Sequence, residues 1–233
     1  MYHPFSVAET LKIAWHLFKK NFATIAVYSL VAFIIFIGLP FIIYNFLDGN
    51  ILETIGFIIL LISISFVFLG FIKLVFILID KAYYDFDFSD IVPTIKMIYS
   101  YILLLIVVST ISVIMSNAVA LLHESIIRYL LGLLILLFFQ FFFLFYFPIC
   151  TCFIVDDGSG PFESVAQSFQ LIKGNFIKYI LLFILIEALV FLGAITVIGM
   201  IMVIPFVNIV LVVAYRKLVY SHKDVDDDIA ETL

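Results

Sequence analysis

The chain has 233 residues, of which 66% are hydrophobic and 12% are charged, and its formal net charge at pH 7 is −5. Globular domains carry roughly a quarter charged residues, so this composition excludes a water-soluble domain and indicates an integral membrane protein. Long apolar runs without in/out alternation favour helices over barrel strands. We therefore predict one all-α membrane domain over residues 1–233, with an acidic tail at 221–233.

The first segment mixes polar and apolar residues, reading PFSVAETLKIAWHLFKKNF at 4–22. On a helical wheel its apolar residues share one face and its charged residues the other. Ser6 and Glu9 have the spacing of a capping box, which predicts a helix start. Such a helix lies in the membrane interface, with Trp15 at headgroup level and Lys19 and Lys20 reaching anionic lipid, or packs on the protein's own cytoplasmic face, and both arrangements can hold at once.

Hydropathy then predicts six transmembrane spans, at about 22–46, 54–80, 99–121, 127–153, 176–198 and 200–220. The first span lacks a small-residue cleavage site, so we expect it to stay as a transmembrane helix rather than be removed as a signal peptide. Short turns join the spans in pairs. We therefore predict three helical hairpins.

The basic residues predict which way the spans run. One side of the membrane receives nearly all of them, whereas the other receives Arg128. By the positive-inside rule, both termini are expected to be cytoplasmic, in a multi-pass protein of a bacterial cytoplasmic (inner) membrane. The residues on the predicted cytoplasmic side are Lys12, Lys19, Lys20, Lys81, Lys96, Lys173, Lys178, Arg216, Lys217 and Lys223.

The opening segment has a counterpart before the fifth span, PFESVAQSFQLIKGNF at 161–176, in which Lys173 takes the place of Lys19. A fainter version begins at Phe88, before the third span. We predict a threefold repeat whose units are a cytoplasmic interfacial amphipathic helix followed by a hairpin. The units cover about 4–82, 88–153 and 161–220.

Two short motifs flank the third unit: Val155-Asp156-Asp157-Gly158 lies just before it, and Ala214-Tyr215-Arg216-Lys217-Leu218 lies near its end. Over about residues 153–220 this pattern resembles a group of bacterial six-helix membrane proteins. The group includes the YciC-like family and the membrane domain of some glycerophosphoryl diester phosphodiesterases. The resemblance implies a six-helix membrane protein and supplies no catalytic residues.

Two charged residues lie inside spans, where burial is costly and often marks a transport pathway. Glu187 is about 11 residues into its span, roughly 17 Å deep, so it must be protonated, hydrogen-bonded or facing a wet cavity. Lys73 is close enough to the cytoplasmic end to reach the headgroups. A transporter would pair the two or let Glu187 carry a proton. We favour a structural role for both.

No known catalytic motif is present, so we expect no enzyme activity and no cofactor. Cys150 and Cys152 lie near the predicted cytoplasmic boundary, where thiols stay reduced, and they lack the neighbouring ligands of a metal site. The four histidines are far apart in sequence and fall on both predicted sides of the membrane, so we do not expect them to form one metal site. The aromatic block FFQFFFLFYF at 138–147 is expected to face lipid or to form a groove for a hydrophobic partner.

These patterns predict a non-catalytic scaffold, accessory subunit or lipid-organising module of the membrane. The alternative is a small transporter or channel that uses Glu187 and Lys73. The expected partners are membrane lipids and another membrane protein or complex, and no nucleic acid. The expected lipid or interface contacts are Trp15, Lys19, Lys20 and Lys173.

Overall fold

The structure is a computed structural model that describes residues 5–46, 49–80, 87–123 and 125–230. These residues are almost wholly helical, and no strand occurs among them. The acidic side chains of the predicted tail lie outside the described residues, as does Lys81. The elements in chain order are α1 (Val7–Lys20), α2 (Phe22–Phe46), α3 (Asn50–Asp80), α4 (Phe88–Ile91), α5 (Ile95–Ala120), α6 (Ile126–Phe141), the π-helical turn η1 (Phe142–Tyr146), α7 (Phe147–Asp156), α8 (Pro161–Lys173), α9 (Phe176–Gly193) and α10 (Val197–Ala230).

Six helical segments of the described chain are long and apolar enough to cross a membrane. Each contains or largely overlaps one of the predicted spans. The predicted class of an all-α, multi-pass membrane protein is therefore confirmed. The six segments are Phe22–Asn45, Ile51–Asp80, Ser89–Ala120, Ile126–Asp156, Phe176–Gly193 and Gly199–Ser221.

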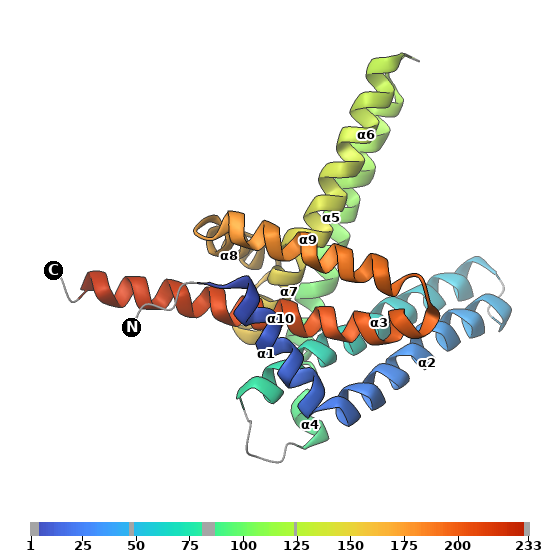
Figure 1. The fold of residues 1–233 in the computed structure, drawn as a ribbon. Helices are drawn as coiled ribbons and strands as arrows, with labels where there is room; N and C mark the ends of the chain where they lie inside the picture. The colour runs from blue at the N-terminus through green and yellow to red at the C-terminus, as the bar shows by residue number, and fades with distance from the viewer. Residues whose placement is uncertain (1–4, 47–48, 81–86, 124, 231–233) are drawn as a thin grey trace.

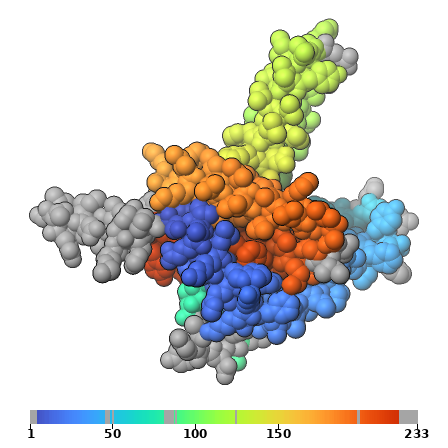
Figure 2. Space-filling view, viewed as in Figure 1, coloured from blue at the N-terminus to red at the C-terminus, as the bar shows by residue number. Residues whose placement is uncertain are grey.

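Consecutive spans contact each other as α2 with α3, α5 with α6, and α9 with α10. Figure 1 shows that the pairs point in different directions, with α2 and α3 extending to one side and α5 and α6 projecting away from the rest. The α5–α6 arm stands clear as a separate column of atoms in Figure 2. Helix α10 lies at the centre and contacts α1, α2, α3, α7, α8 and α9.

The hydrophobic core is concentrated at one end of the spans. Its buried side chains cluster in residues 67–76 of α3, 147–155 of α7 and 207–218 of α10. These stretches all lie toward the ends that the basic residues predict to be cytoplasmic. At the opposite ends, large apolar side chains are exposed on α2, α3, α5 and α6. The chain therefore has a packed base and diverging outer halves that bury little against one another.

The aromatic block at 138–147 is divided between core and surface: Phe139, Phe145 and Phe147 are buried, whereas Phe138 and Phe141 are exposed. The expectation that the block faces lipid or a hydrophobic partner therefore stays a prediction for its exposed part. The block contains η1, which ends directly before Phe147 and Pro148. Proline has no backbone N–H and cannot continue the regular α-helical ladder, and a π-turn absorbs such a local irregularity. The Tyr179 hydroxyl donates to the Phe145 carbonyl at 3.1 Å, so α9 supports this turn.

Two local predictions are corrected at helix starts. The amphipathic helix expected at Phe88 is reduced to the four residues of α4. Pro93 disfavours the α conformation in the residue before it, and that residue, Val92, is extended, with ψ of 120°. Helix α1 starts at Val7 as expected, but the Ser6 side chain makes no capping hydrogen bond. The Thr10 hydroxyl instead donates to the Ser6 carbonyl at 2.8 Å.

Candidate functional site

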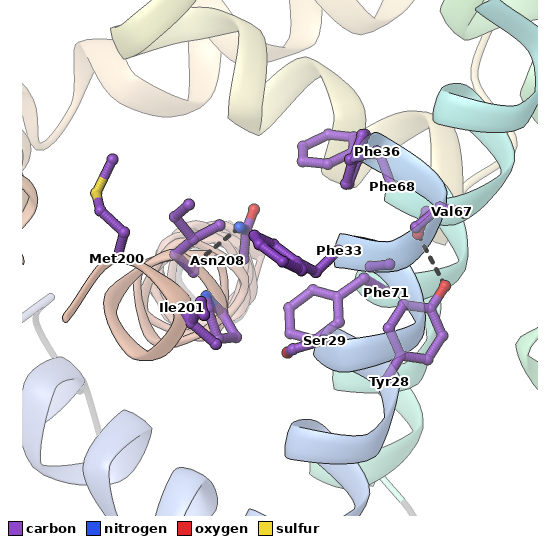
Figure 3. Close-up of a pocket in the computed structure, with 13 residues that line it drawn as sticks. Tyr28, Ser29, Phe33, Phe36, Val67, Phe68, Phe71, Met200, Ile201 and Asn208 are labelled. Atoms are coloured by element: carbon purple, nitrogen blue, oxygen red, sulfur yellow. Dashed lines mark hydrogen bonds between the residues drawn. The ribbon is translucent and has the colours of Figure 1, made fainter. Parts of the chain in front are cut away.

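Two adjoining apolar cavities lie where α2 diverges from the core. The first, of about 200 Å³, lies between α2, α3 and α10 (Figure 3). The second, of about 340 Å³, lies between α1, α2 and α10. Four residues line both cavities, and we call the combined space around them the α2–α10 groove. The shared residues are Ser29, Phe33, Ile201 and Pro205.

Small side chains and a proline leave this space open. Ser29 and Ala32 of α2 face the first cavity, and Ala26 faces the second. On the opposite wall Pro205 lies inside α10, where its ring removes a helical hydrogen bond to the carbonyl four residues earlier. Small residues at these positions leave part of the space between α2 and α10 unfilled. In Figure 3 the ring of Phe33 projects into this space from α2.

One wall of the groove is held in place by Tyr28. Its hydroxyl donates to the Val67 carbonyl of α3 at 2.8 Å, and its ring lies 5.4 Å from that of Phe71. Gly70 makes the close approach possible, because a Cβ atom there would come 2.5 Å from the Tyr28 hydroxyl oxygen. Glycine at this position therefore leaves room for the Tyr28 hydroxyl to reach the Val67 carbonyl.

The second cavity ends at the corner between α1 and α2, where Phe18 and Phe22 line it. Trp15 stacks on Phe18, with 5.9 Å between ring centroids, and meets the edge of Phe206 of α10 at 5.7 Å. The Lys19 ammonium lies 4.8 Å above the Trp15 ring. The structure thus brings two of the predicted lipid contacts, Trp15 and Lys19, together beside the groove.

The other two predicted contacts are placed differently. Lys20 is exposed at the last turn of α1, next to Lys19. Lys173 is exposed at the end of α8 and lines neither cavity. Helix α1 itself packs along α10 through its buried residues Thr10, Ala14 and Phe18. The structure thus shows α1 packed on the protein itself, and its placement in the membrane interface stays a prediction.

The two charged residues within the spans are not joined to each other. The Lys73 ammonium donates to the Val92 carbonyl at 2.8 Å, which links α3 to the segment between α4 and α5. Glu187 is half-buried on α9, and its carboxyl group has no hydrogen-bond or ion-pair partner among the residues that the structure describes. Lys73 thus has a structural contact of its own, independent of Glu187.

Sequence reasoning missed a polar cluster at the base of the spans, which we call the Arg216 clamp and define as Asp80, Asp156, Tyr215 and Arg216. The Arg216 guanidinium contacts Asp80 with Nη2 at 2.6 Å and Asp156 with Nη1 at 3.0 Å. The Tyr215 hydroxyl donates to the same Asp156 oxygen at 3.0 Å. The guanidinium also lies 4.6 Å above the ring of Phe76.

The Arg216 clamp joins the ends of three spans, because its two carboxylates belong to α3 and α7 and its cation to α10. The Arg216 side chain is 18% exposed and that of Asp156 is 19% exposed, so the pair is largely removed from solvent. Charge-assisted hydrogen bonds in such surroundings fix geometry strongly. One signal was readable in the sequence: each of these residues lies at the predicted cytoplasmic end of a span. Asp156 is the last residue of α7.

A second ion pair holds α1 against α10. Lys217 contacts the Glu9 carboxylate at 2.6 Å. Cys150 and Cys152 are buried, and the Cys150 sulfur lies 3.2 Å from the Ser168 hydroxyl of α8. Within the described residues, no group of three or more His, Cys, Asp or Glu side chains is arranged to hold a metal ion. The polar contacts at the base thus connect helices.

No protein-family model, curated protein or solved structure matches this chain. The resemblance of residues 153–220 to bacterial six-helix membrane proteins therefore stays a prediction.

Proposed function

We propose that this protein is a non-catalytic multi-pass membrane protein that organises lipid by holding an acyl chain in the α2–α10 groove. The observation that carries the proposal is the pair of adjoining apolar cavities between spans. Their volumes together fall within the roughly 300–1,000 Å³ typical of ligand sites. The basic residues support a cytoplasmic membrane as its location, with both termini in the cytoplasm.

The polar groups of the groove support a hydrocarbon ligand. The Tyr28 hydroxyl is engaged by the Val67 carbonyl, and the Asn208 amide donates to the Ile204 carbonyl at 2.9 Å. A ligand rich in hydrogen-bonding groups needs several convergent polar partners in its site. Beyond these internal hydrogen bonds, the lining side chains offer such a ligand little except the Ser29 hydroxyl and the remaining N–H and oxygen of the Asn208 amide.

The groove is also open sideways, as lateral access from a bilayer requires. Among its lining residues, Phe33 is 42% exposed and Ile204 is 51% exposed. An acyl chain can therefore enter between α2 and α10 while its headgroup stays at the interface. Because lipid tails are as apolar as the side chains they meet, residence there depends on van der Waals packing in the groove, and shape decides the affinity.

The experiment is to purify the protein in mild detergent and to count retained phospholipids by native mass spectrometry. We expect about one tightly held lipid per chain in the wild type. Ser29→Phe should remove it, because a ring at this shared position would project into the space where the two cavities meet. Val27→Phe is the matched control, since Val27 is 66% exposed on the same helix and lines neither cavity.

The control separates filling of the groove from a general effect of a larger side chain on α2. Thermal melting in detergent should show both variants folded. Wild-type protein without retained lipid would refute the proposal, and so would equal lipid retention in all three proteins.

A further inference from the structure

The corner between α1 and α2 combines an apolar cavity with fixed positive charge. Lys19 and Lys20 end α1, and Phe18 and Phe22, which flank them in sequence, line the second cavity. The groove thus runs from a hydrocarbon-like interior to a basic turn. A lipid whose tail lies between α2 and α10 would have its headgroup near this turn.

The position of the Lys19 ammonium is set by its neighbours. It lies 4.8 Å above the ring of Trp15, and Trp15 in turn contacts Phe18 and Phe206. A cation over an indole ring is attracted by its π electrons, so the ammonium stays beside the end of the cavity. Tryptophan itself favours the headgroup level of a bilayer, where a lipid phosphate lies.

The surrounding charges favour a negative ligand. Glu9 lies on the same helix nearly three turns before Lys19, and its carboxylate contacts Lys217 at 2.6 Å. None of the residues lining the second cavity is acidic. The ammonium group of a zwitterionic headgroup would thus meet lysines, with no carboxylate from the cavity lining beside it, whereas an anionic headgroup carries no such group.

We propose that the α2–α10 groove selects an anionic phospholipid, with one acyl chain between α2 and α10 and the phosphate beside Lys19. This inference rests on the proposed acyl-binding function and adds the class of headgroup. It assigns Lys19 to recognition of the headgroup and the shared groove residues to recognition of the tail.

The test compares phosphatidylglycerol with phosphatidylcholine of the same acyl chains, each titrated onto delipidated full-length protein and followed by native mass spectrometry. We expect the wild type to bind phosphatidylglycerol more tightly. Lys19→Gln should weaken phosphatidylglycerol binding roughly fivefold, the effect of one lysine near a lipid surface, and leave phosphatidylcholine binding unchanged. Lys19→Arg should restore the preference.

Lys173→Gln is the matched control, because Lys173 holds the corresponding position in the predicted repeat and lines neither cavity. It should bind both lipids like the wild type. Equal affinity of the wild type for the two lipids would overturn the headgroup assignment while leaving the acyl groove in place. Equal loss in Lys19→Gln and Lys173→Gln would likewise overturn it. Binding of neither lipid would refute the proposed function itself.

Discussion

The two ion pairs of the Arg216 clamp, with Asp80 and with Asp156, should contribute unequally to the free energy of unfolding. A double-mutant cycle measures each contribution. We expect Arg216→Met to be the most damaging single change, because it leaves Asp156, only 19% exposed, without its cation. Breaking a fully buried ion pair costs about 3–5 kcal/mol. Partial exposure lowers this cost, so we expect about 2–3 kcal/mol for the loss of Arg216.

The two carboxylates should differ, because their exposure differs. Asp80 is 47% exposed, and an exposed ion pair is worth about 0.2–1 kcal/mol, so Asp80→Asn should cost little. Asp156→Asn should cost more, about 1–2 kcal/mol, because it weakens charge-assisted hydrogen bonds from both Arg216 and Tyr215. The coupling of Arg216 to Asp156 should therefore exceed its coupling to Asp80.

The assay is reversible unfolding in mixed micelles, from which the free energy of unfolding of each single and double variant is obtained. The cycle isolates each pair, since the shared background of the single variants cancels. A coupling to Asp80 equal to or larger than that to Asp156 would refute the reasoning from burial. No measurable coupling to either carboxylate would refute the Arg216 clamp as a stabilising contact.

Two further substitutions test contacts between spans, each followed by the free energy of unfolding in the same micelles. Gly70→Ala should destabilise by about 1–3 kcal/mol, because the new methyl group would come 2.5 Å from the Tyr28 hydroxyl oxygen; Gly132→Ala, with no atom within 4 Å, is the control and should be neutral or slightly stabilising. Equal effects would contradict the close packing of α2 on α3. Tyr179→Phe should cost about 1 kcal/mol by removing the hydrogen bond to the Phe145 carbonyl, and an unchanged stability would show that η1 needs no support from α9.

The spans could be predicted from the sequence because their signal is local. A run of about 20 apolar residues specifies a membrane helix whatever its neighbours are. The Arg216 clamp has no such local signal, since its carboxylates lie 60 and 136 positions from Arg216 along the chain. The Arg216 clamp forms only where the ends of α3, α7 and α10 come together, and the apolarity of each span does not indicate which other spans it will contact.

The candidate site was predictable in part for the same reason. The amphipathic pattern placed Trp15 and Lys19 on one helix near the membrane surface, and the structure brings them together beside the groove. The groove itself depends on the spacing between α2 and α10, which small residues and Pro205 determine jointly. The sequence could not separate the buried phenylalanines of residues 138–147 from the exposed ones, because an aromatic block has the same composition whether lipid or another helix covers it.

The concentration of packing at the base predicts how tolerance of mutation is distributed along the spans. Leu134, in the projecting arm, is 61% exposed, and exchange for another large apolar residue there should disturb little packing. Ile149, at the base of the same span, is fully buried, where even a change of shape at constant volume costs stability. Over evolutionary time the outer halves of the spans are therefore free to drift among apolar residues, while substitutions at the base must compensate one another.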